Sequence, residues 1–126
     1  MADDLFKKSD VYELKDKDFS DEHLTHQNFR GKKGFVVFYA PWCPNCQNKV
    51  EFWKLLGHNY NVGKFSDKPL RIGAVNTEDP LTRDISAKMK ITAIPAFFHV
   101  QKNGLLTPYQ GQGYSPEDLL LELMRQ

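Results

Sequence analysis

Apolar and aromatic residues fall into short runs along the chain, separated by polar segments that contain glycine. The longest run, "GFVVFYA" at residues 34–40, does not alternate with polar residues, as expected of a central strand that is covered on both faces. Four further runs predict strands, at 11–14, 70–77, 95–100 and 105–111. The Asn103-Gly104 pair predicts a hairpin between the last two, and Pro108 places the final strand at a sheet edge.

The segments between these runs carry the signals of helices. Ser20 precedes two acids, as at a helix N-terminus, and the pattern changes to helical spacing after Pro41. We predict four helices, at 20–29, 44–57, 80–90 and 115–124. Gly31 and Gly34 predict a turn before the central strand. The order βαβαβαββα predicts a mixed sheet, with a parallel part, an antiparallel hairpin and helices on both faces.

Length and composition fit one globular domain. The chain has 126 residues, of which 40% are hydrophobic and 26% are charged. We therefore treat residues 1–126 as a single domain, in which residues 1–10 could form a loose N-terminal segment. The 17 basic and 16 acidic residues leave a net charge of +1, which disfavours nucleic acid or an anionic membrane as the partner.

The sequence shows no secretory signal, no run of about 20 apolar residues that could span a membrane, and no retention signal in its last residues, "LMRQ". A single pair of cysteines is also too few for a disulfide-stapled secreted scaffold. We therefore expect a cytoplasmic protein, a monomer without a membrane partner.

The two cysteines, Cys43 and Cys46, could bind a metal, form a structural disulfide or exchange electrons. At helical positions i and i+3 their side chains lie on one face, about 5–6 Å apart. Cys43 falls at the predicted helix start, where free N–H groups and the helix dipole favour a thiolate, whereas Cys46 lies one turn inside. We favour redox exchange, with Cys43 attacking and Cys46 resolving, over a metal site, because the nearest histidine, His58, lies beyond the helix.

The segment "FVVFYAPWCPNC" resembles the thioredoxin superfamily, and within it the disulfide isomerase domains whose active site has the form FYAPWCxxC. The segments "RIGAVNTED", "ITAIPAFF", "KNG" and "YQGQGYSPEDLL" follow in the family's order, so that the resemblance covers nearly the whole chain. It implies an α/β fold, the thioredoxin-like three-layer α/β/α sandwich with a mixed five-stranded sheet.

The same resemblance implies the layout of the site. The Ile94-Pro95 bond should be cis and should lie beside the cysteines, where its backbone would pair with an extended substrate. Trp42, Pro44 and Asn45 should also contact the substrate. No cofactor or metal is implied; the partners would be proteins that carry disulfides or dithiols, and a reductase or a small thiol as electron donor.

Four positions depart from the family pattern. Val37 stands where thioredoxins have a buried Asp and disulfide isomerases a Glu, the proton acceptor for the resolving cysteine, so we expect slower resolution. Pro44-Asn45 replaces the Gly-His of the isomerases, and without the imidazole the site should be less oxidising. Ala96 follows the proline where many relatives have Thr.

We therefore expect a thiol–disulfide oxidoreductase that reduces or isomerises disulfides of protein substrates through the Cys43–Cys46 couple. The alternative is a non-catalytic binding or adaptor module of the same fold, in which the CPNC pair is a structural or vestigial disulfide. The absence of a carboxylate at position 37 is the observation that favours this alternative.

Overall fold

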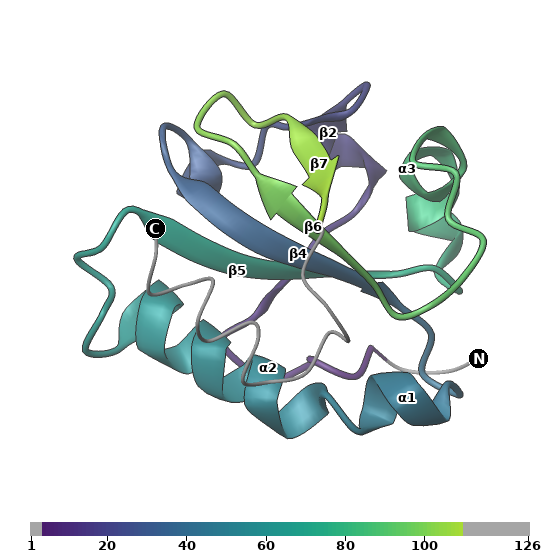
Figure 1. Ribbon diagram of the computed structural model, residues 1–126, viewed down its shortest axis with the longest axis horizontal. Helices are drawn as coiled ribbons and strands as arrows, with labels where there is room; N and C mark the ends of the chain where they lie inside the picture. Colours follow the sequence, from purple (N-terminus) through teal and green to yellow (C-terminus); the bar gives the residue numbers. More distant parts are fainter. Residues whose placement is uncertain (1–3, 110–126) are drawn as a thin grey trace.

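A computed structural model describes residues 4–109 of the chain, and its centre is a five-stranded mixed sheet (Figure 1). The strand order across this sheet is β1-β5-β4-β6-β7. The strands are β1 Tyr12–Glu13, β4 Lys33–Tyr39, β5 Leu70–Asn76, β6 Ala96–Val100 and β7 Leu106–Pro108. The predicted helix at 115–124 lies outside the described residues.

Strand β4 is the middle of the sheet, as its apolar run predicts. It pairs in parallel with β5 and antiparallel with β6. Neither face of β4 is open to solvent, because residues 34–39 are all buried. The edge position predicted for the last strand is confirmed, because β7, which contains Pro108, pairs only with β6. The first strand, β1, forms the other edge and pairs only with β5.

Helices lie on both faces of the sheet. In Figure 1, α1 and α2 lie below it and α3 lies above it. The helices are α1 Pro44–Gln47, α2 Val50–Gly57 and α3 Arg83–Lys88, with a π-helical turn, η3 His58–Val62, after α2 and a 3-10 turn, η4 Pro80–Thr82, before α3. Helix α2 packs Trp53 into the lower apolar layer, and α3 packs Ile85 into the upper one. The predicted three-layer α/β/α fold is confirmed.

The helix predicted at 20–29 is wrong. This segment forms a small hairpin, β2 Phe19–Ser20 and β3 His23–Leu24, followed by a 3-10 turn, η2 Gln27–Phe29. Asp21 turns the chain with φ at +52°, which a helix cannot include. Strand β3 also bonds the tip of the β6–β7 hairpin, where the Leu24 N–H donates to the Gly104 carbonyl oxygen at 2.7 Å. These long-range bonds outweigh the local helix signals.

The turn predicted from Gly31 to Gly34 is shorter than expected. Gly31 occupies a turn with φ at +72°, whereas Gly34 already belongs to β4. A Cβ atom at Gly34 would lie 2.4 Å from the carbonyl oxygen of Arg71 on the neighbouring strand. Close approach of two backbones, rather than a turn, is what requires glycine at position 34.

Residues 4–10 lie against the lower face of the sheet, in the segment that we expected to be loose. Phe6 is 3% exposed and packs edge-on against Tyr39. The Leu5 N–H donates to the Tyr39 hydroxyl oxygen, and the Phe6 N–H donates to the Glu13 carboxylate. An aromatic anchor and two backbone hydrogen bonds thus attach this segment.

Candidate functional site

The two cysteines lie where β4 passes into α1, at the carboxyl end of the central strand. Cys43 is the N-cap residue of α1, and Pro44 occupies the first turn, where a missing N–H costs nothing. The Cys46 N–H donates to the Cys43 sulfur, with a nitrogen-to-sulfur distance of 3.2 Å. Both cysteines are free thiols and are buried. The predicted placement of one sulfur at the helix start and the other one turn inside is therefore observed.

The two thiols differ in their surroundings. Burial, together with a hydrogen bond to the Cys43 sulfur, raises the pKa of Cys46 to about 12. At neutral pH Cys46 is therefore a protonated thiol. Cys43 accepts the Cys46 N–H, an arrangement that stabilises negative charge on its sulfur.

The loop before β6 lies beside Cys43. The Ile94-Pro95 peptide bond is cis, and the Cys43 sulfur lies 4.0 Å from the Ile94 carbonyl oxygen. The structure thus brings this distant pair next to the cysteines, where the resemblance placed it. Trp42 is 62% exposed next to Cys43, at the surface of the site.

Pro44 and Asn45 are both exposed on α1, between the cysteines. A partner that approaches Cys43 would meet their side chains. The roles of these two residues and of Trp42 in substrate contact remain predictions.

Val37 faces a small cavity beneath Cys46. The cavity has a volume of about 10 Å³ and is lined by Phe6, Val37, Tyr39, Cys46, Lys49, Trp53, Pro95 and Phe97. No carboxylate is among these lining residues. The proton acceptor that the family places at position 37 is thus missing from the structure as well as from the sequence.

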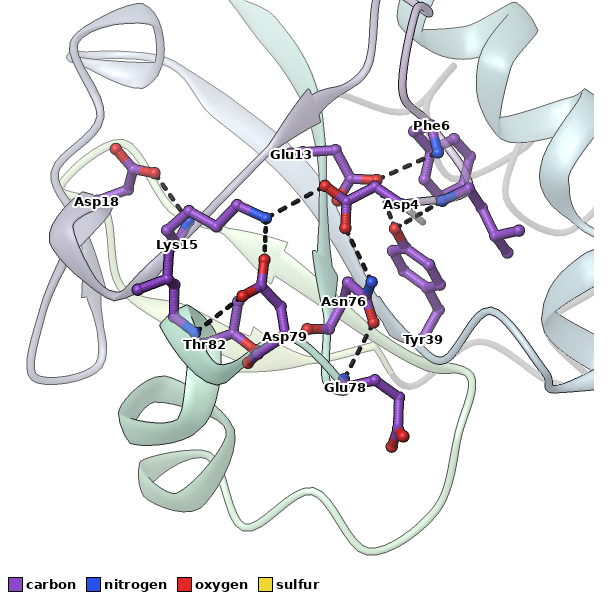
Figure 2. A network of polar contacts seen from close by, with 12 residues as sticks. Asp4, Phe6, Glu13, Lys15, Asp18, Tyr39, Asn76, Glu78, Asp79 and Thr82 are labelled. Atoms are coloured by element: carbon purple, nitrogen blue, oxygen red, sulfur yellow. Dashed lines mark hydrogen bonds and ion pairs between the residues drawn. The ribbon is translucent and has the colours of Figure 1, made fainter. Parts of the chain in front are cut away.

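A partly buried carboxylate nevertheless lies in the same row of the sheet. Strand register aligns Glu13 of β1 with Ala74 of β5, and Ala74 with Val37 of β4. Paired residues project to the same face, so Glu13 shares the face of Val37. Figure 2 shows the Glu13 carboxylate against the hydroxyl group of Tyr39, which donates to Glu13 Oε2 at 2.5 Å.

The environment of this carboxylate favours its neutral form. Burial raises the pKa of Glu13 to about 7, against the hydrogen bond from Tyr39. Among the described residues, Glu13 Oε1 is buried without a hydrogen-bond partner. Burial also raises the pKa of Tyr39 far above its ordinary value, so that its hydroxyl stays protonated.

A network of charged groups lies beside Glu13 (Figure 2). Lys15 bridges Asp4 at 3.2 Å and Asp79 at 2.5 Å. The buried Asn76 amide donates to the other Asp4 oxygen at 2.8 Å. This network ties the N-terminal segment to the carboxyl end of β5. Glu13 and Tyr39 were not identified as site residues from the sequence. The sequence does show an acid in the predicted first strand, but only the strand register shows that this acid lies in the row of Val37.

Within residues 4–109, no three His, Cys, Asp or Glu side chains come close enough together to hold a metal ion. In the same part of the chain, no helix has both the length and the apolar character needed to cross a bilayer.

Several curated proteins are similar to this chain. Mouse thioredoxin-related transmembrane protein 4 is 35% identical over 79 residues, 62% of this chain and 21% of that protein. Human thioredoxin-related transmembrane protein 1 is 38% identical over 77 residues, 60% of this chain and 24% of that protein. Protein disulfide-isomerase tigA of Aspergillus niger is 30% identical over 108 residues, 86% of this chain and 25% of that protein. The chain thus spans at most a quarter of the length of these three relatives.

These relatives overturn the expectation of a cytoplasmic protein. Thioredoxin-related transmembrane proteins and protein disulfide-isomerases point to a membrane or endoplasmic reticulum location instead. The expectation rested on signals that the sequence lacks, and a missing signal carries less weight than a positive match.

Solved structures and a family model agree on the fold. The J-Trx1 fragment of ERdj5 superposes with a TM-score of 0.70 at 22% identity, over 96% of this chain and 54% of that one. The first thioredoxin domain of mouse protein disulfide-isomerase A4 gives 0.67 at 18% identity, over 92% of this chain and 74% of that one. The thioredoxin family model matches residues 10–126. The protein therefore belongs to the thioredoxin family.

Proposed function

We propose that this protein is a thiol–disulfide oxidoreductase that acts on protein substrates through Cys43 and Cys46. The observation that carries the proposal is the pairing of two free thiols one helical turn apart, in which the Cys46 N–H donates to the Cys43 sulfur. A thiol that is only structural needs no such stabilisation of charge on its sulfur.

The chemistry follows from the difference between the two sulfurs. In the reductive direction, the Cys43 thiolate attacks a substrate disulfide and forms a mixed disulfide. Cys46 then attacks Cys43, the two cysteines form a disulfide, and the substrate leaves reduced. The reverse sequence oxidises a substrate dithiol. Cys46 is the less favourable attacking thiol, because burial raises its pKa and favours the protonated form.

Substrate binding is proposed at the surface around Cys43. Trp42 supplies an exposed aromatic face, Pro44 and Asn45 lie exposed between the cysteines, and the Ile94-Pro95 backbone lies beside the reacting sulfur. The names of the relatives favour work at a membrane or in the endoplasmic reticulum, where disulfides of proteins are made and rearranged.

The proposal is tested by the reduction of insulin disulfides with dithiothreitol as electron source. The protein should accelerate the reaction above the rate of the reagent alone, and Cys43→Ser should abolish the acceleration. An unaffected rate in Cys43→Ser would refute the proposal. The exposed Asn48 offers a matched control, Asn48→Ser, which should retain the wild-type rate.

A binding module without catalysis is the second candidate, because apolar Val37 replaces the family's proton acceptor beneath Cys46. The two candidates differ in what Cys46→Ser does. An oxidoreductase should then accumulate covalent mixed disulfides through Cys43, which dithiothreitol releases. A binding module should retain partners only through non-covalent contacts.

A further inference from the structure

Resolution of the mixed disulfide requires that Cys46 lose its proton, and nothing next to Cys46 is an obvious acceptor. Burial keeps its thiol protonated. The cavity beneath it contains one basic side chain, Lys49, and no carboxylate. A proton acceptor for Cys46 must therefore act from a greater distance or from solvent.

Glu13 lies on the face of the sheet where such an acceptor is needed. It lies in the row of Val37 but two strands away, which corresponds to roughly 10 Å at the usual strand spacing. That distance is too long for direct contact between the carboxylate and a group above Val37. Tyr39, on the same face of β4, fills the gap, because it lines the cavity with Cys46 and its hydroxyl donates to Glu13 Oε2.

We propose that Glu13, acting through the Tyr39 hydroxyl, accepts the proton of Cys46 and so replaces the carboxylate that is missing at Val37. This inference rests on the proposed oxidoreductase function. The cavity between Cys46 and Tyr39 is close to the smallest volume that holds one water molecule. The proposed path includes one water molecule in this cavity, between the thiol and the phenol.

The step balances as follows. In the mixed disulfide, Cys43 is bonded to a substrate sulfur and Cys46 is a thiol. The Cys46 proton moves to the bridging water, the water passes a proton to the Tyr39 oxygen, and the Tyr39 proton moves to Glu13 Oε2. The Cys46 sulfur forms a bond to the Cys43 sulfur, and the substrate leaves as a thiolate with the electron pair of the broken bond. Glu13 returns its proton when the Cys43–Cys46 disulfide is next reduced.

The surroundings of Glu13 suit a group that gains and loses a proton near neutral pH. The charged and titratable groups that face it are Tyr39, Asp4 and Lys15. Its Oε1 atom has no hydrogen-bond partner among the described residues, and its pKa is raised to about 7. Most buried side-chain polar atoms have a hydrogen-bond partner, so the unpartnered Oε1 atom calls for an explanation.

The two steps can be followed separately with 5,5′-dithiobis(2-nitrobenzoate) and the reduced protein in a stopped-flow instrument. Attack by Cys43 releases the first nitrothiobenzoate, and resolution by Cys46 releases the second. In the wild type, the rate of the second phase should rise with pH around neutrality. In Glu13→Gln and in Tyr39→Phe, the second phase should slow at least about tenfold at pH 7.5 and lose this rise, while the first phase stays within about twofold.

Two further variants separate a proton path from a structural effect. The exposed Glu51 of α2 offers a control, and Glu51→Gln should follow the wild type in both phases. The double variant Glu13→Gln with Val37→Glu should regain the rise near neutral pH, because the acid then stands at the family's position. A second phase that follows the wild type in Glu13→Gln and Tyr39→Phe would overturn the inference and leave the proposed function intact. Absence of both phases in the wild type would overturn the proposed function itself.

Discussion

The backbone N–H of Cys46 points at the sulfur of Cys43, at a nitrogen-to-sulfur distance of 3.2 Å. This bond distinguishes two cysteines of similar burial. The sulfur of Cys43 receives the Cys46 N–H, whereas burial raises the pKa of Cys46 to about 12 even though a backbone hydrogen bond from Ala40 opposes this shift. Two thiols one helical turn apart are therefore chemically unequal before any substrate arrives.

We expect iodoacetamide to modify Cys43 of the reduced protein at pH 7 at least about tenfold faster than Cys46, because the thiolate is the reactive form and burial raises the pKa of Cys46. Mass spectrometry of peptides after timed quenching measures both rates. In Cys43→Ser, Cys46 should remain unmodified until urea unfolds the chain. Equal labelling of the two cysteines in the folded protein would contradict the asymmetry.

The Glu13 carboxyl should make stability depend on pH. Its pKa is raised by burial from 4.5 to about 7, so the folded state holds a proton that the unfolded state loses. The protonated Glu13 carboxyl therefore contributes to the free energy of unfolding fully below pH 4.5, and this contribution is lost as pH rises to about 7. It amounts to at most about 3 kcal/mol. Urea unfolding of wild type and Glu13→Gln from pH 4.5 to 7.5 should show the wild type losing stability relative to the variant. A constant difference across this range would count against the buried carboxyl.

Asn61 should be the most costly polar side chain to replace in η3. Its amide nitrogen donates to the carbonyl oxygens of Asp10 and Ile72 at 2.7 and 2.9 Å, and its oxygen accepts the Ile72 N–H at 3.0 Å. We expect Asn61→Leu to lower the free energy of unfolding by about 2–4 kcal/mol, because these buried groups lose their partners. Chemical denaturation measures the loss, and Asn48→Leu at an exposed site is the control.

Gly34→Ala should destabilise the sheet although it adds only one methyl group. The new Cβ would lie 2.4 Å from the Arg71 carbonyl oxygen and 2.9 Å from the Phe29 ring. We expect a loss of about 1–3 kcal/mol, because backbone must shift to make room. Lys33→Ala in the same strand should change stability by less than about 0.5 kcal/mol. A thermal midpoint of Gly34→Ala equal to that of the wild type would refute the close contact.

Trp42→Ala tests the proposed substrate surface. Because Trp42 is 62% exposed, its removal should change stability by less than about 0.5 kcal/mol. The kcat/KM for insulin reduction should fall about tenfold, since an aromatic contact is lost, while the rate with a small aromatic disulfide stays within about twofold. Leu55, 56% exposed on α2, supplies the control Leu55→Ala. Equal loss with both substrates would instead implicate Trp42 in the chemistry.

Strands were easier to predict from this sequence than helices. The apolar run of β4 requires cover on both faces, and the Asn103-Gly104 pair forms the turn between β6 and β7. Local sequence was therefore sufficient to predict these strands. The segment at 20–29 has a plausible cap and polar spacing, yet it pairs with the distant residues Gly104 and Leu105. Local signals cannot report bonds that form only after the sheet is assembled.

The cysteine pair and its Ile94-Pro95 neighbour could be predicted because their residue types and order resemble a family pattern. Glu13 could not, because its relation to Val37 depends on two strand registers through Ala74. The motif itself, residues 35–46, contains no acid. Tyr39 was part of the predicted central strand, but only the structure shows that its hydroxyl donates to Glu13.

The edge strands of the sheet also limit how other chains can attach to it. Strand β1 has two residues, and β7 has three and ends in Pro108, which has no N–H to offer. The described part of the sheet therefore presents no long open ladder on which a misfolded polypeptide could continue the β structure. For a protein proposed to act on disulfides of protein substrates, a substrate would then be held covalently through one sulfur and released, without extension of the sheet.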